Sequence, residues 1–438
     1  MTDPAQLIRR KLVLWLVAPL TLLTLLNSID RVNVSFAALQ MNKELGFSPA
    51  QYGFGVSLFF VGYVACSFPH TALLRRFGAR RWIFGAVLFW GFVSTALAWT
   101  QSVGEFYALR LLLGVAEAGF APGIVFIMSQ WMPQRFRASA IAGTMLAVPI
   151  SMIFGAPFSG WLMTADTGLS WPGWRFMFLV EGSLTVAVAL MTPWLFVDEP
   201  EHAKWLRDDE KQWLRTEIER DIRDQEPARA RSFTALLRTR PLWAAAGVWF
   251  TLMSGAYGII YWLPQVIKQL SGLNDFEVSL LSAFPWIGLG AGMVINSWHS
   301  DLTQERHWHV ALAGLLSAVG LVGAIAFGDR WPALLCLTVG AFGLGAAQGA
   351  FWALPTSLLD RSVAASGLTF ITVLGSAGGL VTPPMIGLVR AQTGSFGMPV
   401  VLLAGLLCVG AVFVPWIRAQ APARSAPVPA SVGNSPHA

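Results

Sequence analysis

Long apolar stretches separated by short polar segments dominate the chain. Twelve of these stretches are long enough to cross a bilayer, because about 20 residues of α-helix at about 1.5 Å each span the roughly 30 Å hydrocarbon core. They fall at residues 12–38, 51–74, 82–100, 106–132, 139–164, 175–197, 241–268, 277–298, 309–328, 332–359, 364–390 and 396–417. The pattern predicts an all-α membrane protein with twelve transmembrane helices.

A single long polar segment, residues 198–240, separates the sixth apolar stretch from the seventh. It mixes charges of both signs and carries apolar residues at helical spacing, namely Trp205, Trp213, Leu214 and Ile218. We therefore expect an amphipathic linker between two six-helix bundles, at residues 1–197 and 241–417. The tail at residues 418–438 is rich in Pro, Ala and Ser, and we expect it to be disordered.

Composition and charge narrow the class further. Hydrophobic residues make up 55% of the chain and charged residues only 12%, whereas about a quarter of residues are charged in soluble domains. The basic residues behind the net charge of +6 lie at helix ends rather than on one soluble face, so we expect contact with membrane lipid and no nucleic-acid partner.

The distribution of Lys and Arg also predicts orientation. Most of the thirty fall on one side of the membrane, the side of the N-terminus, which the positive-inside rule makes cytoplasmic. Both termini are then cytoplasmic, and the expected location is the cell inner membrane. Two arginines, Arg31 and Arg110, are left inside the spans.

Each of these arginines has a carboxylate near it in the sequence. Arg110 and Glu117 are seven residues apart, so they share one helix face about 10 Å from each other. Asp30 and Arg31 are adjacent and project about 100° apart, so they can face different neighbours. Ionisable groups inside a bilayer are costly unless they face a protein interior or aqueous cavity, and therefore they indicate functional sites. Structural salt bridges are the alternative.

One arrangement makes chemical use of all four charges. Arg31 and Arg110 can act as fixed cations for an anionic substrate, while Asp30 and Glu117 act as proton acceptors. The protonation of the carboxylates then depends on whether an anion occupies the arginines. Such a site would couple proton movement to anion movement.

Other polar and aromatic residues inside the spans are less specific. Tyr63 can hydrogen-bond a carboxylate or a backbone carbonyl, and Glu181 is expected to make an interhelical structural contact. The second half has no charge inside its spans, but it has aromatic and hydroxyl side chains there: Tyr261, Trp286, Trp352, Thr372 and Ser376. The aromatic residues can contact a ligand or simply pack, and the hydroxyls can bind a ligand or join helices.

An enzyme that spans the membrane several times is the alternative class, and the sequence gives it little support. The histidines lie in loops or at helix ends, and His299, His307 and His309 near Asp301 lack the spacing of a known metal site. No glycine-rich phosphate loop precedes a lysine, so ATP is not expected to supply energy. We expect no metal and no cofactor, with the proton as the coupling ion.

From about Leu12 to Ile417 the chain resembles the major facilitator superfamily, and within it the anion:cation symporter family with its bacterial tartrate, phthalate, 4-hydroxyphenylacetate and sugar-acid transporters. The motifs that carry this resemblance are IDRVNVSFA, RFGARRW, RLLLGVAEAGFAPG, WRFMFLVEG, DEPEHAKWL, YWLPQVIKQL, HSDLTQERHWH and FWALPTSLL.

The resemblance implies the major facilitator fold and import of a small organic anion by proton symport through alternating access. It assigns proton coupling to Asp30 and Glu117, substrate carboxylate binding to Arg31 and Arg110, and a substrate hydrogen bond to Tyr63. An anion exchanger or uniporter that does not use protons would have the same fold and stays open. We expect a monomer.

The chain departs from the family pattern in two places. Thr372 and Ser376 stand where the family often has two asparagines, which favours a compact or aromatic carboxylate over a long sugar acid. Arg75 occupies the place of an acidic residue in the loop that also holds Arg80 and Arg81. We expect these last two arginines to contribute to gating together with Asp301, which keeps an acid in the matching loop of the second half.

Overall fold

The computed structural model describes residues 4–166, 170–224, 237, 239–328, 330–358 and 361–420. Within these residues there are helices and no strand. Twelve helical segments are long and apolar enough to cross a membrane, in agreement with the twelve predicted spans. The helices are α1 (Pro4–Leu12), α2 (Ala18–Glu44), α3 (Pro49–Phe77), α4 (Ala79–Ala96), α5 (Val103–Glu117), α6 (Phe120–Trp131), α7 (Gln134–Met145), α8 (Ala147–Thr164), α9 (Gly173–Leu195), α10 (Asp208–Asp224), α12 (Arg240–Ser271), α13 (Asp275–Thr303), α14 (His307–Phe327), α15 (Arg330–Phe351), α16 (Ala353–Leu358), α17 (Arg361–Thr393) and α18 (Gly397–Gln420).

Three spans predicted as single helices are each interrupted. The breaks lie between α5 and α6, between α7 and α8, and between α15 and α16. A proline follows each break: Pro122, Pro149 or Pro355. In an α-helix each N–H donates to the carbonyl oxygen four residues earlier, and proline has no N–H, so the carbonyl at the break loses this hydrogen bond. The break in the fourth span lies directly after Glu117, the last residue of α5.

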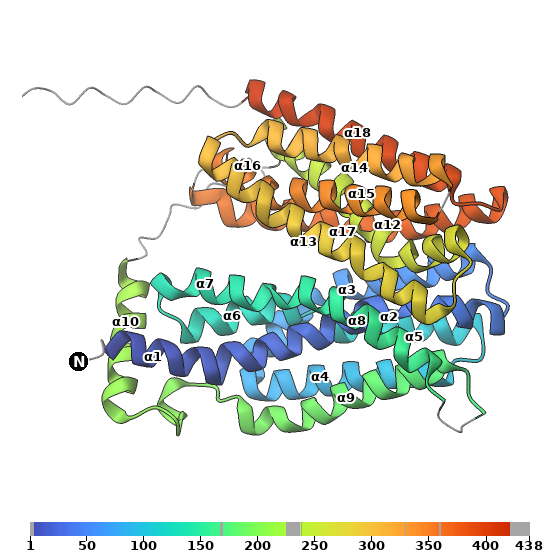
Figure 1. Cartoon of the computed structure of the whole chain (residues 1–438). Helices are drawn as coiled ribbons and strands as arrows, with labels where there is room; N and C mark the ends of the chain where they lie inside the picture. Colours follow the sequence, from blue (N-terminus) through green and yellow to red (C-terminus); the bar gives the residue numbers. More distant parts are fainter. Residues whose placement is uncertain are drawn as a thin grey trace, which may run out of the picture.

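The helices form two groups (Figure 1). The first nine helices, blue to green, lie below those from α12 to α18, yellow to red, and α10 runs across the left-hand ends of the lower group. The groups touch mainly where α3 packs against α17, α8 against α13 and α2 against α12.

Small residues allow the two halves to approach closely. A Cβ atom on Gly53 of α3 would lie 2.3 Å from the Pro383 carbonyl oxygen of α17, and one on Gly387 would lie 2.3 Å from the Pro49 carbonyl oxygen. Close backbone approach of this kind holds helices together in lipid, where apolar side chains gain little from leaving the solvent.

Polar contacts between the halves lie at the same end of the bundle. The Tyr52 hydroxyl donates to the Tyr261 carbonyl oxygen over 2.9 Å, and the Gln40 amide donates to Asp275 Oδ2 over 2.9 Å. Gln40 and Tyr261 lie toward the ends of α2 and α12, and Tyr52 and Asp275 lie near the starts of α3 and α13. The glycine contacts involve the last third of α17. The close contacts therefore gather at the end opposite to the N-terminus and α10.

At the other end, α10 binds to the first half. Glu210 is buried and pairs with Lys11 over 2.6 Å, and Leu214 is also buried. Trp205, just before α10, stacks on Trp15 and Trp131. The linker therefore has the amphipathic character that its sequence indicates. Linker residues 225–236 and most of the tail predicted to be disordered, residues 421–438, lie outside the described residues.

Candidate functional site

An ion pair joins α2 to α5 inside the first half. Arg31 Nη2 lies 2.9 Å from Glu117 Oε2, and Glu117 is fully buried. The guanidinium of Arg31 also lies 5.3 Å from the ring centroids of both Phe59 and Tyr63 on α3. This cation is thus held by a carboxylate and two aromatic faces.

The partner of Glu117 corrects one expectation from the sequence. The sequence places Arg110 on the same helix face as Glu117, about 10 Å away, and so offers Arg110 as the cation that acts on this carboxylate. Two turns of one helix leave about 10 Å between two residues, whereas the neighbouring α2 brings Arg31 within hydrogen-bond distance.

Arg110 itself is fully buried and unpaired. Its guanidinium lies 5.1 Å from the centroid of the Phe59 ring, but none of its three side-chain nitrogens has a hydrogen-bond partner among the described residues. The buried hydroxyl of Tyr261, from α12 in the other half, lies next to Arg110 without a well-aligned hydrogen bond to it, and it feels the charges of Arg110, Arg31 and Glu117. An unpaired buried cation is costly, so these donors are arranged to meet an acceptor.

Asp30 faces away from this pair, as its position next to Arg31 predicted. It accepts hydrogen bonds from Trp90 Nε1, over 2.5 Å, and from the Ser94 hydroxyl, both on α4. It still interacts electrostatically with Arg110 and with Glu117. Asp30 is therefore a buried carboxyl group connected to the arginine site through the local field rather than by direct contact.

A second carboxyl group extends this network. Asn33 Nδ2 donates to Asp30 Oδ1 over 3.0 Å and to Glu181 Oε2 over 2.9 Å. The Ser159 hydroxyl donates to Glu181 Oε1 over 2.7 Å. Glu181 on α9 thus contacts α2 and α8, as expected of an interhelical residue, but it is deeply buried rather than close to solvent.

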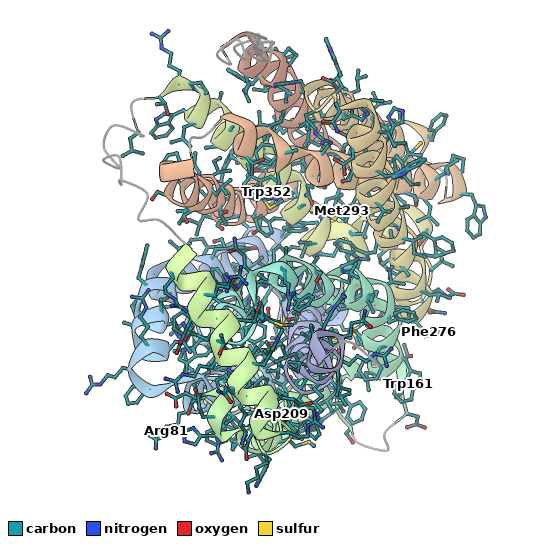
Figure 2. All side chains as sticks on the ribbon, turned by 90° about the vertical axis from the view of Figure 1, so that its left-hand side faces the viewer. Arg81, Trp161, Asp209, Phe276, Met293 and Trp352 are labelled. Atoms are coloured by element: carbon teal, nitrogen blue, oxygen red, sulfur yellow. The ribbon has the colours of Figure 1, made fainter. Side chains whose placement is uncertain are left out.

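The structure brings only some of the other predicted residues to the arginines. Tyr63 packs against Arg31, and Tyr261 interacts with Arg110. Trp352 lies at the break between α15 and α16 against Trp249, with ring centroids 4.6 Å apart, in the upper half of Figure 2, and Trp286 is buried in α13. The hydroxyls of Thr372 and Ser376 donate to carbonyl oxygens of their own helix.

The residues expected to take part in gating have separate partners. The backbone N–H of Arg80 donates to Asp198 Oδ1 over 2.8 Å, and Asp301 pairs with Arg306 in its own loop over 2.6 Å. Arg81 lies on the side of the first half that faces away from the second half (Figure 2). Their role in gating stays a prediction.

Sequence reasoning missed several partners. Phe59 lies one turn before Tyr63 and Asn33 lies about one turn after Asp30, so helical spacing offers a signal for both. Trp90 and Ser159 come from helices whose neighbours only the tertiary structure shows. Among the described residues, no group of three His, Cys, Asp or Glu side chains can hold a metal ion.

Twelve helices in two halves, with buried arginines facing the second half, agree with the result of a family comparison. The model of the Major Facilitator Superfamily matches residues 20–383. The chain belongs to this superfamily. It is therefore a transporter rather than an enzyme, and its predicted twelve-helix fold is confirmed.

Relatives of this superfamily member cover nearly its full length. A protein of Agrobacterium vitis named "Putative tartrate transporter" is 40% identical over 413 residues, which are 94% of this chain and 95% of the relative. The "Quinolone resistance transporter" of Acinetobacter baumannii is 34% identical and covers 91% of this chain and 93% of its own. A solved structure of a bacterial homologue of the human lysosomal transporter Spinster, inward-facing and occupied, shares the fold with a TM-score of 0.75 at 16% identity, over 92% of this chain and 96% of that one.

Proposed function

We propose that this protein imports a small organic anion with at least one carboxylate, by proton symport and alternating access, across the bacterial inner membrane. The observation that supports this most is Arg110, fully buried with all three side-chain nitrogens unpaired. Its planar fork suits two parallel hydrogen bonds to a carboxylate. The hydroxyl of Tyr261, next to Arg110, offers a further polar group from the other half, and the name of the tartrate transporter relative supports the same class of substrate.

Proton coupling follows from the pairing of Arg31 with Glu117. A substrate carboxylate that forms an ion pair with Arg31 competes with Glu117 for this cation. A buried carboxylate that loses its cation is stabilised by taking up a proton, so a proton binds when the substrate binds. Asp30 acts with Glu117 through their electrostatic interaction. The proton is the coupling ion in this proposal, and no cofactor takes part.

The experiment that tests coupling uses Glu117→Gln in proteoliposomes loaded with labelled tartrate. The amide mimics the protonated acid, so we expect exchange between two loaded sides to persist and accumulation driven by a pH gradient to disappear. Glu105→Gln is the matched control, because Glu105 is an exposed carboxylate at the start of the same helix, α5. Accumulation that survives in Glu117→Gln would remove Glu117 from coupling, and unmodified protein that exchanges tartrate without responding to pH would favour a proton-independent exchanger.

Substrate class is tested by the thermal stability of the purified protein. A ligand present at 100 times its Kd stabilises the folded state by about 2.7 kcal/mol, which raises the melting temperature. We expect tartrate or a small aromatic carboxylate to raise it and a long aldonate to have little effect. A quinolone is tested in the same assay as a ligand of a different class, because the Acinetobacter relative is named a quinolone resistance transporter. Stabilisation by the quinolone alone would contradict the carboxylate proposal.

A further inference from the structure

A second group of cations lies at the end of the molecule where the two halves meet. A cavity of about 370 Å³ opens there between α2 and the start of α3 on one side and α12 and α17 on the other. Its lining includes Lys43, Lys268 and Arg390. The volume falls within the roughly 300–1,000 Å³ of small-molecule sites. We call this cavity the vestibule.

The cations of the vestibule outnumber the carboxylates that neutralise them. Lys268 pairs with Asp275 over 2.8 Å. Lys43 and Arg390 have no carboxylate partner among the described residues. Arg390 is held in place by other means, because its Nη1 donates to Gln265 Oε1 over 2.7 Å and its guanidinium lies 4.1 Å from the centroid of the Phe396 ring. The vestibule therefore has a positive potential.

Gln265 gives a second, independent indication of an anion. Its side chain is only 6% exposed, and its Nε2 has no hydrogen-bond partner. Because Arg390 already occupies the amide oxygen, the orientation of the amide is set and its N–H groups remain as donors. A buried amide donor without a partner is costly. The lining also holds one unpaired acceptor, Asn42 Oδ1, but its three cations make donors the larger part of the site. The chemistry of this site suits a small oxyanion.

The side chains of Tyr52 and Trp262 connect the vestibule with the arginine site. The Tyr52 hydroxyl, which donates to the Tyr261 carbonyl oxygen, interacts electrostatically with both Arg110 and Arg390. The ring of Trp262 packs edge-on against Tyr52, and Arg390 lies 5.8 Å from the centroid of that ring. Tyr52 thus lies between two cationic sites that follow one another along the boundary of the halves.

We propose that the vestibule is a second anion site, which binds a small carboxylate at the closed end of the transport path before the carboxylate reaches Arg110. This inference rests on the proposed transport of carboxylates. Cations in a cleft raise the local concentration of an anion and its rate of association, and added salt weakens the effect. Separation of Tyr52 from Tyr261 then lets the anion pass.

Initial rates of tartrate uptake in right-side-out membrane vesicles test this inference. We expect Lys43→Gln and Arg390→Gln each to raise KM about three- to tenfold with kcat within about twofold, because a lost cation weakens attraction and leaves the central site intact. The KM of the unmodified protein rises with ionic strength, and this rise becomes weaker in both variants. Arg390→Lys keeps the charge and restores most of the affinity.

The control is Lys204→Gln, which removes an exposed cation from the linker at the opposite end. Lys43 is the more informative target, because it is exposed and its replacement leaves the packing unchanged. The inference is overturned if Lys43→Gln and the double variant Lys43→Gln/Arg390→Gln have the same KM and the same salt dependence as Lys204→Gln. A fall in kcat alone overturns it too. A complete lack of carboxylate uptake by the unmodified protein is a different result, which overturns the proposed function and this inference with it.

Discussion

At the scale of single residues, the site depends on the difference between a paired and an unpaired arginine. Arg31 pairs with the carboxylate of Glu117, whereas Arg110 lies against the Phe59 ring and the Tyr261 hydroxyl and has no carboxylate partner among the described residues. A guanidinium presents its donors in a fixed plane, and a lysine presents a single point charge. The geometry of the fork therefore decides the role of Arg110, rather than its charge.

Arg110→Lys tests this distinction. We expect uptake of tartrate to fall by at least about tenfold, since one of two charge-assisted hydrogen bonds worth about 1.5–3 kcal/mol is lost. The thermal shift given by tartrate should shrink in parallel. Arg76→Lys, which changes an exposed arginine at the end of α3, serves as the control. If Arg110→Lys takes up tartrate at nearly the rate of the unmodified protein, Arg110 is excluded from the anion site.

The charged residues of the site could be found from the sequence, because a charge inside a long apolar stretch is visible without a structure. Asp30, Arg31, Arg110 and Glu117 were selected in this way. The pairing of Arg31 with Glu117 was not predictable, since it depends on how α2 lies against α5. Of the five proposed contacts in the second half, the structure places Tyr261 beside Arg110, while Thr372 and Ser376 bond to their own helix.

At the scale of helices, close packing between α3 and α5 holds both arginines in position. A Cβ atom on Gly114 would lie 1.9 Å from the carbonyl oxygen of Phe59, the residue that both guanidinium groups cover. Helix breaks were partly readable from the sequence, because a proline removes a known hydrogen bond. The contact at Gly114 could not be predicted, because the fourth span has several glycines in similar apolar sequence and nothing in the sequence shows which of them meets α3.

Gly114→Ala should therefore lower both stability and uptake. Overpacking of a tight contact costs about 1–3 kcal/mol, and the displaced Phe59 backbone moves the ring that carries both arginines. Gly104→Ala is the matched control in the same helix, because a Cβ atom there meets nothing within 4 Å. Melting temperature in detergent and tartrate uptake are the measurements. Equal values for the two variants would contradict the role given to this contact.

The docking of α10 should depend on pH through Glu210. Burial opposes the ionisation of Glu210, but hydrogen bonds from Lys11 and from the backbone N–H of Arg207 outweigh it and hold the pKa of Glu210 below its ordinary value of 4.5. A lowered carboxyl pKa stabilises the docked state above that ordinary value, and this stability is lost as the pH falls through the lowered pKa.

We expect Glu210→Gln to weaken the docking of α10 by about 1 kcal/mol at neutral pH, a modest value because Lys11 is partly exposed to solvent. Cleavage of the linker by trypsin should speed up at neutral pH. Below the lowered pKa the variant and the unmodified protein should become alike, which thermal unfolding followed across pH can show. Glu219→Gln, an exposed carboxylate of the same helix, provides the comparison. Identical cleavage rates in both variants would show that Glu210 does not hold the linker.

At the scale of the whole molecule, the sequence predicted the number of spans well, because hydropathy reports directly on burial in lipid. The way in which the halves meet was less accessible. It depends on particular contacts such as Gly53 against Pro383 and Tyr52 against Tyr261, which lie far apart in the chain. No periodicity within one helix indicates which helix of the other half it will touch.

Tyr52→Phe should shift the balance between the two orientations of the halves. The lost hydrogen bond contributes about 0.5–1.5 kcal/mol, which corresponds to a change of about two- to tenfold in the population with the vestibule end open. Spin labels at Lys43→Cys and Gln269→Cys, in a background where the three cysteines are replaced by serine, would report the distance across the vestibule. Tyr107→Phe controls for loss of a hydroxyl. An unchanged distance distribution in Tyr52→Phe would show that this bond does not hold the halves.

The gathering of close contacts at one end of the bundle has a mechanical consequence. The 33 residues of α17 give it a length of about 50 Å, and its contacts with α3 at Gly53 and Pro49 lie in its last third. If the halves rock as rigid bodies about those contacts, the roughly 33 Å of α17 that precede Pro383 give a movement of about 6 Å at its far end for a turn of about 10°. The molecule is then a lever with a short arm at the vestibule and a long arm at the linker. Because Tyr52 lies between Pro49 and Gly53, at the pivot itself, a small movement at the vestibule accompanies a much larger movement at the linker face.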